Sequence, residues 1–239
     1  MNVGDLCGVI HYFDDFRRDV EVMTKHKPVM QRLGIMGGQN YLLHGRCGTG
    51  KTSFAKAVAT EFDAPIYSVK LHSVPSRLMS KALCPEHRCP IAVVLIEDFD
   101  RYLTGEIGRD AVSELLNALD GIYPAPNIFR FFSANFPERI VHDDAMNTRM
   151  RRKFHFDIQT KEGNFEYIRR LFADVGVEDE DHIRLISEAA EANKLPLRTI
   201  HLHLSRFLCE PNPLKSAADA VFVWLEELTS ISVPKDDNR

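Results

Sequence analysis

The sequence predicts an α/β fold in which a doubly wound parallel sheet of five strands is followed by a small helical domain. Short apolar runs alternate with runs of helical period as far as residue 157, which is typical of parallel strands connected by helices. Runs such as IAVVLI at 91–96 are apolar throughout, as expected for strands that are covered on both faces. The later patterns are all helical. We therefore expect an α/β domain over residues 1–159 and a helical domain over residues 160–239.

The positions of these runs give the expected elements. Apolar runs predict five strands, at 41–44, 66–71, 91–96, 128–133 and 154–156. An apolar face predicts a helix over 51–62, and valine and leucine at helical spacing predict another over 112–119 that ends at Gly121. Four helices are expected after the sheet, over 161–172, 179–192, 195–208 and 214–228, with Gly176 and several prolines between them. The last residues, 233–239, are expected to fray.

Composition limits the classes of protein that fit. The formal net charge of -4 and the pI of about 6.2 do not indicate a polyanionic partner for the whole surface. The five cysteines are an odd number at irregular spacing, which indicates a reducing compartment. The longest apolar run, 91–96, is far shorter than the ~20 residues of a membrane span, and the first residues lack the pattern of a signal peptide. We expect a soluble cytoplasmic protein.

A phosphate-binding motif lies between the first expected strand and the first expected helix. Residues 45–52, GRCGTGKT, match the pattern G-x-x-x-x-G-K-[ST]. Its glycines let successive backbone N–H groups donate to a phosphate at the positive end of a helix. Lys51 is expected to meet the β- and γ-phosphates of ATP, and Thr52 to bind magnesium. The residues expected to bind the nucleotide are Gly45, Cys47, Gly48, Thr49, Gly50, Lys51, Thr52 and Ser53. The alternative is a glycine loop that matches by chance.

An acidic cluster follows the expected strand at 91–96. A phosphate-binding loop needs a second site that holds Mg²⁺ and orients the attacking water. Side chains of adjacent strand residues point to opposite sides, so Glu97 and Asp98 are expected to differ in role. We predict that Glu97 binds magnesium together with Thr52, that Asp98 acts on the water, and that Asp100 supports them. A solvated acidic turn is the alternative.

These motifs resemble those of the AAA+ ATPases, which are P-loop NTPases, and in detail those of the Bcs-type clade. The best-known member of that clade is the mitochondrial chaperone that assembles respiratory complex III. The resemblance rests on YLLHGRCGTGKTSF, VVLIEDFD, SELLNALDG, and FRFFSAN leading to DDAMNTRMRRKF. Most AAA proteins have aspartate before glutamate in the second motif, so the reversed order and LLNALDG point to this clade. The resemblance implies an AAA+ core with a helical lid, ATP and Mg²⁺ as cofactors, and a ring of six or seven subunits.

Further residues take roles only through this resemblance. Asn135 matches the residue that reads the γ-phosphate and orients water, although an asparagine after a strand is often a turn residue. Arg149 and Arg152 match the arginine fingers, and a planar, permanently charged guanidinium suits the γ-phosphate. Met150 and Arg151 replace the usual proline and glycine, and a basic surface turn is the alternative. Arg198 resembles the sensor-two arginine of clamp-loader-like AAA+ proteins, although a solvated arginine at a helix start is equally expected.

Other signals are weaker. Cys84, His87 and Cys89 place three metal-binding residue types within six positions, but a zinc site needs four ligands and no second pair is evident. The membrane helix and N-terminal domain of the Bcs-type family are expected to be missing, because the matching core begins near the first residue. The basic run at 149–153 is compatible with nucleic-acid contact.

Two principal functions are therefore open, and a third is kept beside them. The first is an ATP-hydrolysing ring that remodels or chaperones a macromolecular client, most simply a protein. The second is a nucleic-acid helicase or translocase of the kind that viruses and mobile elements encode. Stimulation of hydrolysis by single-stranded nucleic acid separates these two. The third is an ATP-gated scaffold without hydrolysis, which measured turnover excludes.

Overall fold

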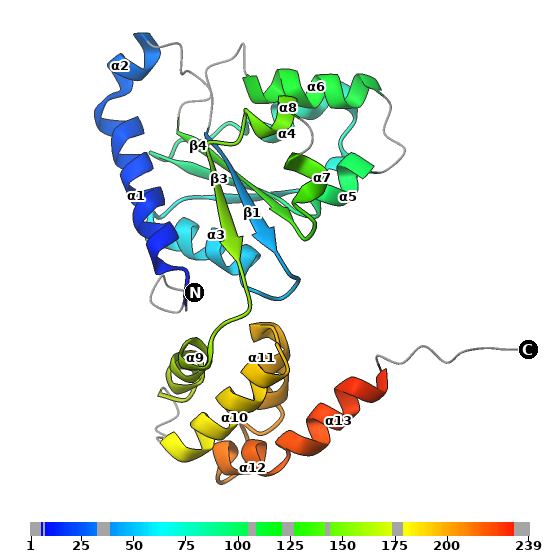
Figure 1. The fold of residues 1–239 in the computed structure, drawn as a ribbon. Helices are drawn as coiled ribbons and strands as arrows, with labels where there is room; N and C mark the ends of the chain where they lie inside the picture. Colours follow the sequence, from blue (N-terminus) through cyan, green and yellow to red (C-terminus); the bar gives the residue numbers. More distant parts are fainter. Residues whose placement is uncertain are drawn as a thin grey trace, which may run out of the picture. The chain divides into compact units, whose positions relative to one another are not determined.

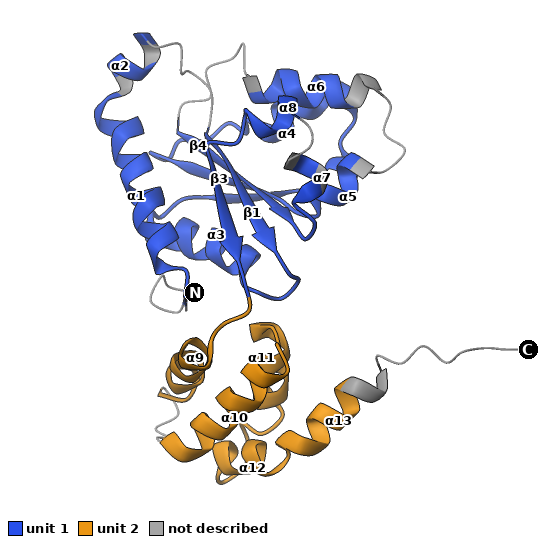
Figure 2. Cartoon of the chain, in the orientation of Figure 1, with its two compact units in different colours: residues 1–157 blue, residues 158–239 orange. Residues whose placement is uncertain are grey.

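A computed structural model describes residue 6 and residues 8–32, 39–104, 109–120, 127–141, 144–173 and 179–231. The chain divides into two compact units, Met1–Asp157 and Ile158–Arg239 (Figure 2). Gly121, Gly176 and the C-terminal tail, for which the sequence gives expectations, lie outside the described residues. The assignment of functional domains to 1–159 and 160–239 stays a prediction.

The first unit contains the predicted parallel sheet of five strands, so the α/β fold class is confirmed. The strands are β1 (Gln39–Gly45), β2 (Ile66–Val69), β3 (Ala92–Ile96), β4 (Ile128–Ala134) and β5 (Arg152–Phe156). Their order in the sheet is β2-β3-β4-β1-β5, and every neighbouring pair is parallel. All residues of β3 and β4 are buried, as expected for strands covered on both faces, although β4 includes Arg130 and Ser133 among its apolar residues.

Helices cover both faces of this sheet (Figure 1). On one face, α1 (Ile10–Lys25) and α3 (Lys51–Glu61) pack with aromatic side chains of β1, β4 and β5. The other face carries α4 (Met79–Leu83), α5 (Phe99–Thr104), α6 (Arg109–Asp120), α7 (Glu138–Val141) and α8 (Asp144–Asn147). This arrangement leaves the loop between β1 and α3 at the carboxyl end of a central strand.

Helix α1 is an element that the sequence analysis did not predict. Phe13, Phe16, Val20 and Met23 recur at helical spacing and are buried in the core beneath the sheet. A short helix, α2 (Lys27–Arg32), follows. The apolar period of α1 is the signal that would have found it.

The described part of the second unit is helical and has five helices where four were expected. It comprises α9 (Lys161–Ala173), α10 (Glu180–Ala192), α11 (Leu197–Ser205), α12 (Pro213–Asp219) and α13 (Val221–Ile231). Its core includes Phe172, Ile186, Leu204 and Trp224. The single helix predicted over 214–228 is wrong, because the chain breaks it at Ala220, where neither glycine nor proline gives a signal.

Other boundaries also differ from the predictions. Strand β2 ends at Val69, and Leu71–Ser73 form a 3-10 turn instead of continuing the strand. Strand β5 begins at Arg152, so this arginine lies within the strand and does not precede it. Among the residues that the structure describes, no helix combines the length and the apolar character needed to cross a bilayer.

Candidate nucleotide site

The loop from Gly45 to Gly50 has backbone conformations that favour glycine. Gly45 ends β1 with φ +136, and Gly48 and Gly50 have φ +80 and +102. A Cβ atom at Gly45 would lie 2.0 Å from the backbone oxygen of Phe156 on the neighbouring strand β5. The close approach of β5 and the positive φ therefore both require glycine at this position, and the loop leads directly into α3.

Lys51 is held at the centre of this loop. Its side chain is buried, and its ammonium donates to Gly45 O at 2.6 Å, Arg46 O at 2.8 Å and Asn135 Oδ1 at 2.9 Å. Burial lowers the pKa of Lys51, against the raising effect of Cys47, Asp100 and Asp98. The three bonds match the three protons of an ammonium group. They also connect Lys51 to Asn135, which follows β4.

Thr52 and Glu97 meet beside this lysine. The Thr52 hydroxyl donates to Glu97 Oε1 at 2.8 Å, although the two residues come from α3 and from the end of β3. A hydroxyl and a carboxylate are the oxygen ligands that Mg²⁺ prefers. The Thr52 hydroxyl and the Glu97 carboxylate therefore fit Mg²⁺, the metal that accompanies the nucleotide in a P-loop.

Asp98 differs from Glu97 in its backbone and its surroundings. It has φ +52, a left-handed conformation that is uncommon outside glycine, while its side chain is exposed like that of Glu97. Arg101 Nη1 lies 3.9 Å from Asp98 Oδ2. Because β3 ends at Ile96 and Asp98 is left-handed, the alternation of strand side chains does not extend to this pair. What distinguishes Glu97 from Asp98 is instead the hydrogen bond that Glu97 accepts from Thr52.

Asp100 connects the acidic segment to β4. It lies in α5 with 0% exposure, and its Oδ2 accepts a hydrogen bond from the backbone N–H of Phe136 at 3.1 Å. Phe136 directly follows Asn135, so Asp100 fixes the backbone next to the amide that meets Lys51. The sequence indicated only a supporting role for Asp100 and did not predict this contact.

The arginine segment lies at the opposite end of the sheet from the loop. In the parallel pairing of β1 with β5, Tyr41 faces Arg152 and Gly45 faces Phe156. These pairs are four residues apart, which corresponds to about 13 Å along the strands. Arg152 is ion-paired with Asp19 of α1, with Nε to Oδ2 at 2.7 Å. Arg149 precedes β5, its backbone oxygen accepts a hydrogen bond from Asn40 Nδ2 near the start of β1, and its guanidinium donates to Ala145 O at 2.5 Å.

The remaining predicted residues have less informative surroundings. Cys47 is an exposed, free cysteine in the loop, and Ser53 lies half-buried in the first turn of α3. Arg198 is exposed near the start of α11 in the second unit. The roles of all three toward a nucleotide stay predictions.

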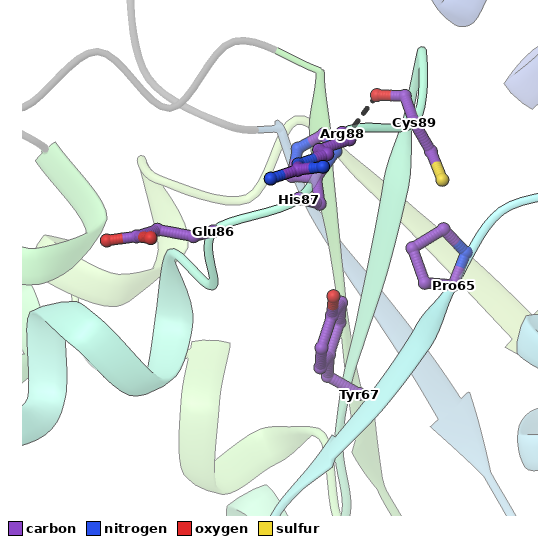
Figure 3. Close-up of a pocket in the computed structure, with 6 residues that line it drawn as sticks. All are labelled: Pro65, Tyr67, Glu86, His87, Arg88 and Cys89. Atoms are coloured by element: carbon purple, nitrogen blue, oxygen red, sulfur yellow. Dashed lines mark hydrogen bonds between the residues drawn. The ribbon is translucent and has the colours of Figure 1, made fainter.

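The segment with Cys84, His87 and Cys89 is not a metal centre among the described residues. Cys84 Sγ accepts a hydrogen bond from Arg130 Nη2 at 2.8 Å, and His87 Nδ1 lies 3.0 Å from the backbone oxygen of Cys89. Over the described part of the chain, no three His, Cys, Asp or Glu side chains gather in a way that holds a metal. A pocket of about 620 Å³ is present here, and Glu86 lies apart from His87 and Cys89 in it (Figure 3). It is lined by Pro65, Tyr67, Glu86, His87, Arg88 and Cys89.

Comparison with known sequences identifies the family of this site. Residues 41–158 match the ATPase family associated with various cellular activities (AAA). Protein CdcH of Halobacterium salinarum is 29% identical over 172 residues, which are 66% of this chain and 22% of that protein. The cell division cycle protein 48 homolog of Archaeoglobus fulgidus is 29% identical over 179 residues, 69% of this chain and 24% of its own. An AAA-ATPase of Arabidopsis thaliana is 36% identical over 106 residues, 44% of this chain and 21% of its own. The chain thus spans about a quarter or less of the length of these relatives.

Comparison with solved structures shows the same fold. The FIGL-1 AAA domain in complex with ADP matches with a TM-score of 0.64 at 17% identity, over 100% of this chain and 86% of that one. The Holliday junction branch migration motor RuvB of Thermotoga maritima matches with a TM-score of 0.61 at 17% identity, over 90% and 69% of the two chains. At this identity the likeness concerns the fold alone. The family match and the geometry of the loop mean that residues 41–158 form a domain of the ATPase family AAA.

Proposed function

We propose that this chain hydrolyses ATP at the loop between β1 and α3 and works as a ring of identical subunits. The observation that carries the ATPase proposal is the convergence of three separate segments on this loop. One hydrogen bond joins Lys51 to Asn135 after β4, and another joins Thr52 to Glu97 after β3. A phosphate-binding lysine, a metal-binding pair and a polar amide are the groups that phosphoryl transfer requires.

The backbone and side-chain groups of the site have different roles in this proposal. Backbone N–H groups from Gly45 to Thr52, with the ammonium of Lys51, hold the phosphates, and the loop side chains of Cys47, Thr49 and Ser53 flank them. Thr52 and Glu97 would hold Mg²⁺, which when bound neutralises charge on the phosphate oxygens. Asp98 is exposed and is the carboxylate that orients the attacking water and accepts its proton. Asn135 reads the γ-phosphate from the position where it now meets Lys51.

Titration with a fluorescent ATP analogue tests the binding part of this proposal. Lys51→Ala should abolish binding, because the loop loses the cation that balances the phosphate charge. Lys56→Ala is a matched control, since Lys56 is an exposed lysine on the same helix and should bind like the wild type. Unchanged affinity in Lys51→Ala would mean that ATP binds elsewhere.

The ring is supported by the position of the arginine segment. Arg149 precedes β5 at the amino ends of the strands, whereas Gly45 ends β1 at the carboxyl ends. A guanidinium there serves a γ-phosphate more readily in a neighbouring subunit than in its own. A site completed by the next subunit requires a head-to-tail contact, which closes into a ring when the rotation permits. We propose six or seven subunits from the resemblance to the AAA+ family.

Mixing two inactive variants tests this completion between subunits. Arg149→Ala and Lys51→Ala should each be nearly inactive, and their mixture should regain activity. Rescue is expected because the intact loop of an Arg149→Ala subunit can be completed by Arg149 of a Lys51→Ala neighbour. Loss of an arginine finger costs on the order of 10³ in rate, so partial rescue is measurable. A mixture as inactive as its components, with a monomer in light scattering with ATP, would contradict the ring.

The client and the clade are finer parts of the proposal. We propose a remodelling ATPase or chaperone whose client is a macromolecule, most simply a protein. The order of Glu97 and Asp98 and the sequence LLNALDG support the Bcs-type clade. Capture of partners by an ATP-loaded Asp98→Asn variant identifies the client. Stimulation of hydrolysis by single-stranded DNA or RNA would favour the alternative of a nucleic-acid motor.

A further inference from the structure

We infer that Asp19 on α1 is a positioning residue for the arginine segment, and that Arg151 and Arg152 are its anchors inside the same chain. This inference rests on the proposed function, because it leaves Arg149 as the arginine that serves the neighbouring subunit. It also separates Arg149 from Arg152, which the family resemblance pairs as two equivalent fingers. The basis is a buried cluster that connects α1, β1 and β5.

Asp19 is the centre of this cluster. Its carboxylate is 2% exposed, and Arg151 Nη2 donates to Oδ1 at 2.8 Å. Arg152 donates through Nε at 2.7 Å and Nη2 at 3.2 Å, and Tyr41 OH donates to Oδ2 at 3.0 Å. Two guanidinium groups and a phenol therefore satisfy one buried carboxylate. If Arg152 turned toward a neighbouring subunit, Asp19 would lose two of these four bonds within a buried site, which is unfavourable.

The backbone of the arginine segment is held from β1 as well. Asn40 Nδ2 donates to Arg149 O at 3.1 Å, and the backbone N–H of Arg151 donates to Asn40 O at 2.8 Å. Arg130, a buried arginine on β4, donates to Asn40 Oδ1 at 3.1 Å and so fixes the orientation of this amide. The main chain on both sides of Met150 is thus tied to the first residues of a central strand.

The two attachments explain how Asp19 acts at a distance. The backbone of Arg149 is held by Asn40, and the guanidinium groups of Arg151 and Arg152 are held by Asp19, whereas the Arg149 guanidinium donates to Ala145 O. Loss of the Asp19 charge removes the attachment on one side and lets the segment shift. A displacement of ~1 Å in a catalytic group costs about 10²-fold in rate. Asp19 thus sets the position of Arg149 without touching the nucleotide.

The test is the substitution Asp19→Asn, which keeps the shape of the side chain and removes its charge. We expect the rate of ATP hydrolysis to fall about 10²-fold while the affinity for the fluorescent ATP analogue stays unchanged. Asp15→Asn is the matched control on the same helix. Asp15 is partly exposed and 3.7 Å from Arg152 Nη1, so its loss should leave the rate near that of the wild type.

Complementation distinguishes positioning from a general structural defect. Mixed with Lys51→Ala, the Asp19→Asn protein should regain activity, because the Lys51→Ala subunit supplies an anchored Arg149 to an intact loop. In an Arg149→Ala background, Asp19→Asn should cause no further loss of rate. If Arg149→Ala is rescued by Lys51→Ala but Asp19→Asn is not, the inference is wrong and the ring stands. If neither is rescued, the proposed ring falls and the inference falls with it.

A second variant decides between an anchor and a finger. Arg152→Gln removes a partly exposed side chain and carries the test if Asp19→Asn does not fold. Alone it should lower the rate about 10²-fold with unchanged nucleotide affinity, and combined with Asp19→Asn it should add little. A loss on the order of 10³ or more in Arg152→Gln alone, or a further loss of that size in the double variant, would show that Arg152 is itself a finger and would overturn the inference.

Discussion

Replacing Gly45 by alanine should destabilise the first unit through two separate effects. The residue has φ +136, and a side chain in such a conformation costs about 1–3 kcal/mol. The new Cβ would also lie 2.0 Å from Phe156 O and 2.9 Å from Phe156 C, which are backbone atoms of the paired strand. Overpacking of this kind typically costs about 1–3 kcal/mol. Alanine also lowers the conformational entropy of the unfolded chain, which stabilises the fold by about 0.4–1 kcal/mol. The free energy of unfolding should therefore fall by roughly 1–5 kcal/mol.

Gly50→Ala separates the two effects. Gly50 also has a positive φ of +102, but an added Cβ would have no heavy atom within 4 Å. This variant should therefore show the conformational cost without the collision with β5. Urea unfolding of both variants, followed by far-UV circular dichroism, gives the two free energies of unfolding. Amide exchange at Phe154 and Phe156 then shows whether the pairing of β5 with β1 is loosened in Gly45→Ala.

The difference in stability between Gly45→Ala and Gly50→Ala tests the close approach of β5 to Gly45. The Gly45→Ala protein should be less stable than Gly50→Ala by about 1–3 kcal/mol, which is a large share of the 5–15 kcal/mol typical of a folded domain. Equal stability of the two variants, with unchanged exchange in β5, would mean that the close approach of Phe156 to Gly45 does not exist in solution.

Two further predictions concern the metal-binding pair and the buried carboxylate. Glu97→Gln should raise the magnesium concentration needed for half-maximal ATP hydrolysis, because an amide is a weaker metal ligand than the carboxylate that is hydrogen-bonded to Thr52. An unchanged magnesium dependence would show that Glu97 does not bind the metal. Burial raises the pKa of Asp19, but hydrogen bonds from Arg151 and Arg152 outweigh it, so the pKa lies below its ordinary value of 3.8. A lowered folded-state pKa stabilises the fold above pH 3.8, and this contribution is lost as the pH falls through the folded-state pKa. The difference in urea midpoint between wild type and Asp19→Asn should thus be constant between pH about 7 and about 5 and shrink below pH 3.8; a difference that persists in acid would contradict the ion-pair account.

Much of the fold follows from patterns that are local in the sequence. Apolar runs predicted the five strands, and the runs are most complete in the central strands β3 and β4, which bury every residue. The break at Ala220 was not predictable in this way, since neither glycine nor proline marks it. Helix α1 was not predicted, although its buried apolar residues recur at helical spacing.

For the candidate site as well, local sequence patterns predicted some residues and could not predict others. The loop, Glu97 and Asp98 were predicted from residue types in a known spacing, and Asn135 from the family resemblance. The cluster around Asp19 depends on contacts between residues more than 130 positions apart, which no local pattern contains. One signal was nevertheless present. Asp19 lies on the apolar stripe of α1 between Phe16 and Val20, and a charge on a buried stripe requires a partner.

The most direct test of ATP hydrolysis at this loop is phosphate release from Mg-ATP by the wild-type chain and by Asp98→Asn. The account predicts turnover by the wild type, and retained ATP binding in Asp98→Asn with a rate lower by on the order of 10²–10⁴, because an amide cannot accept the proton of the attacking water. A wild-type chain that binds ATP without releasing phosphate would support a scaffold. Wild-type turnover in Asp98→Asn, with Glu97→Gln inactive although its metal is still bound, would mean that the two carboxylates have exchanged roles.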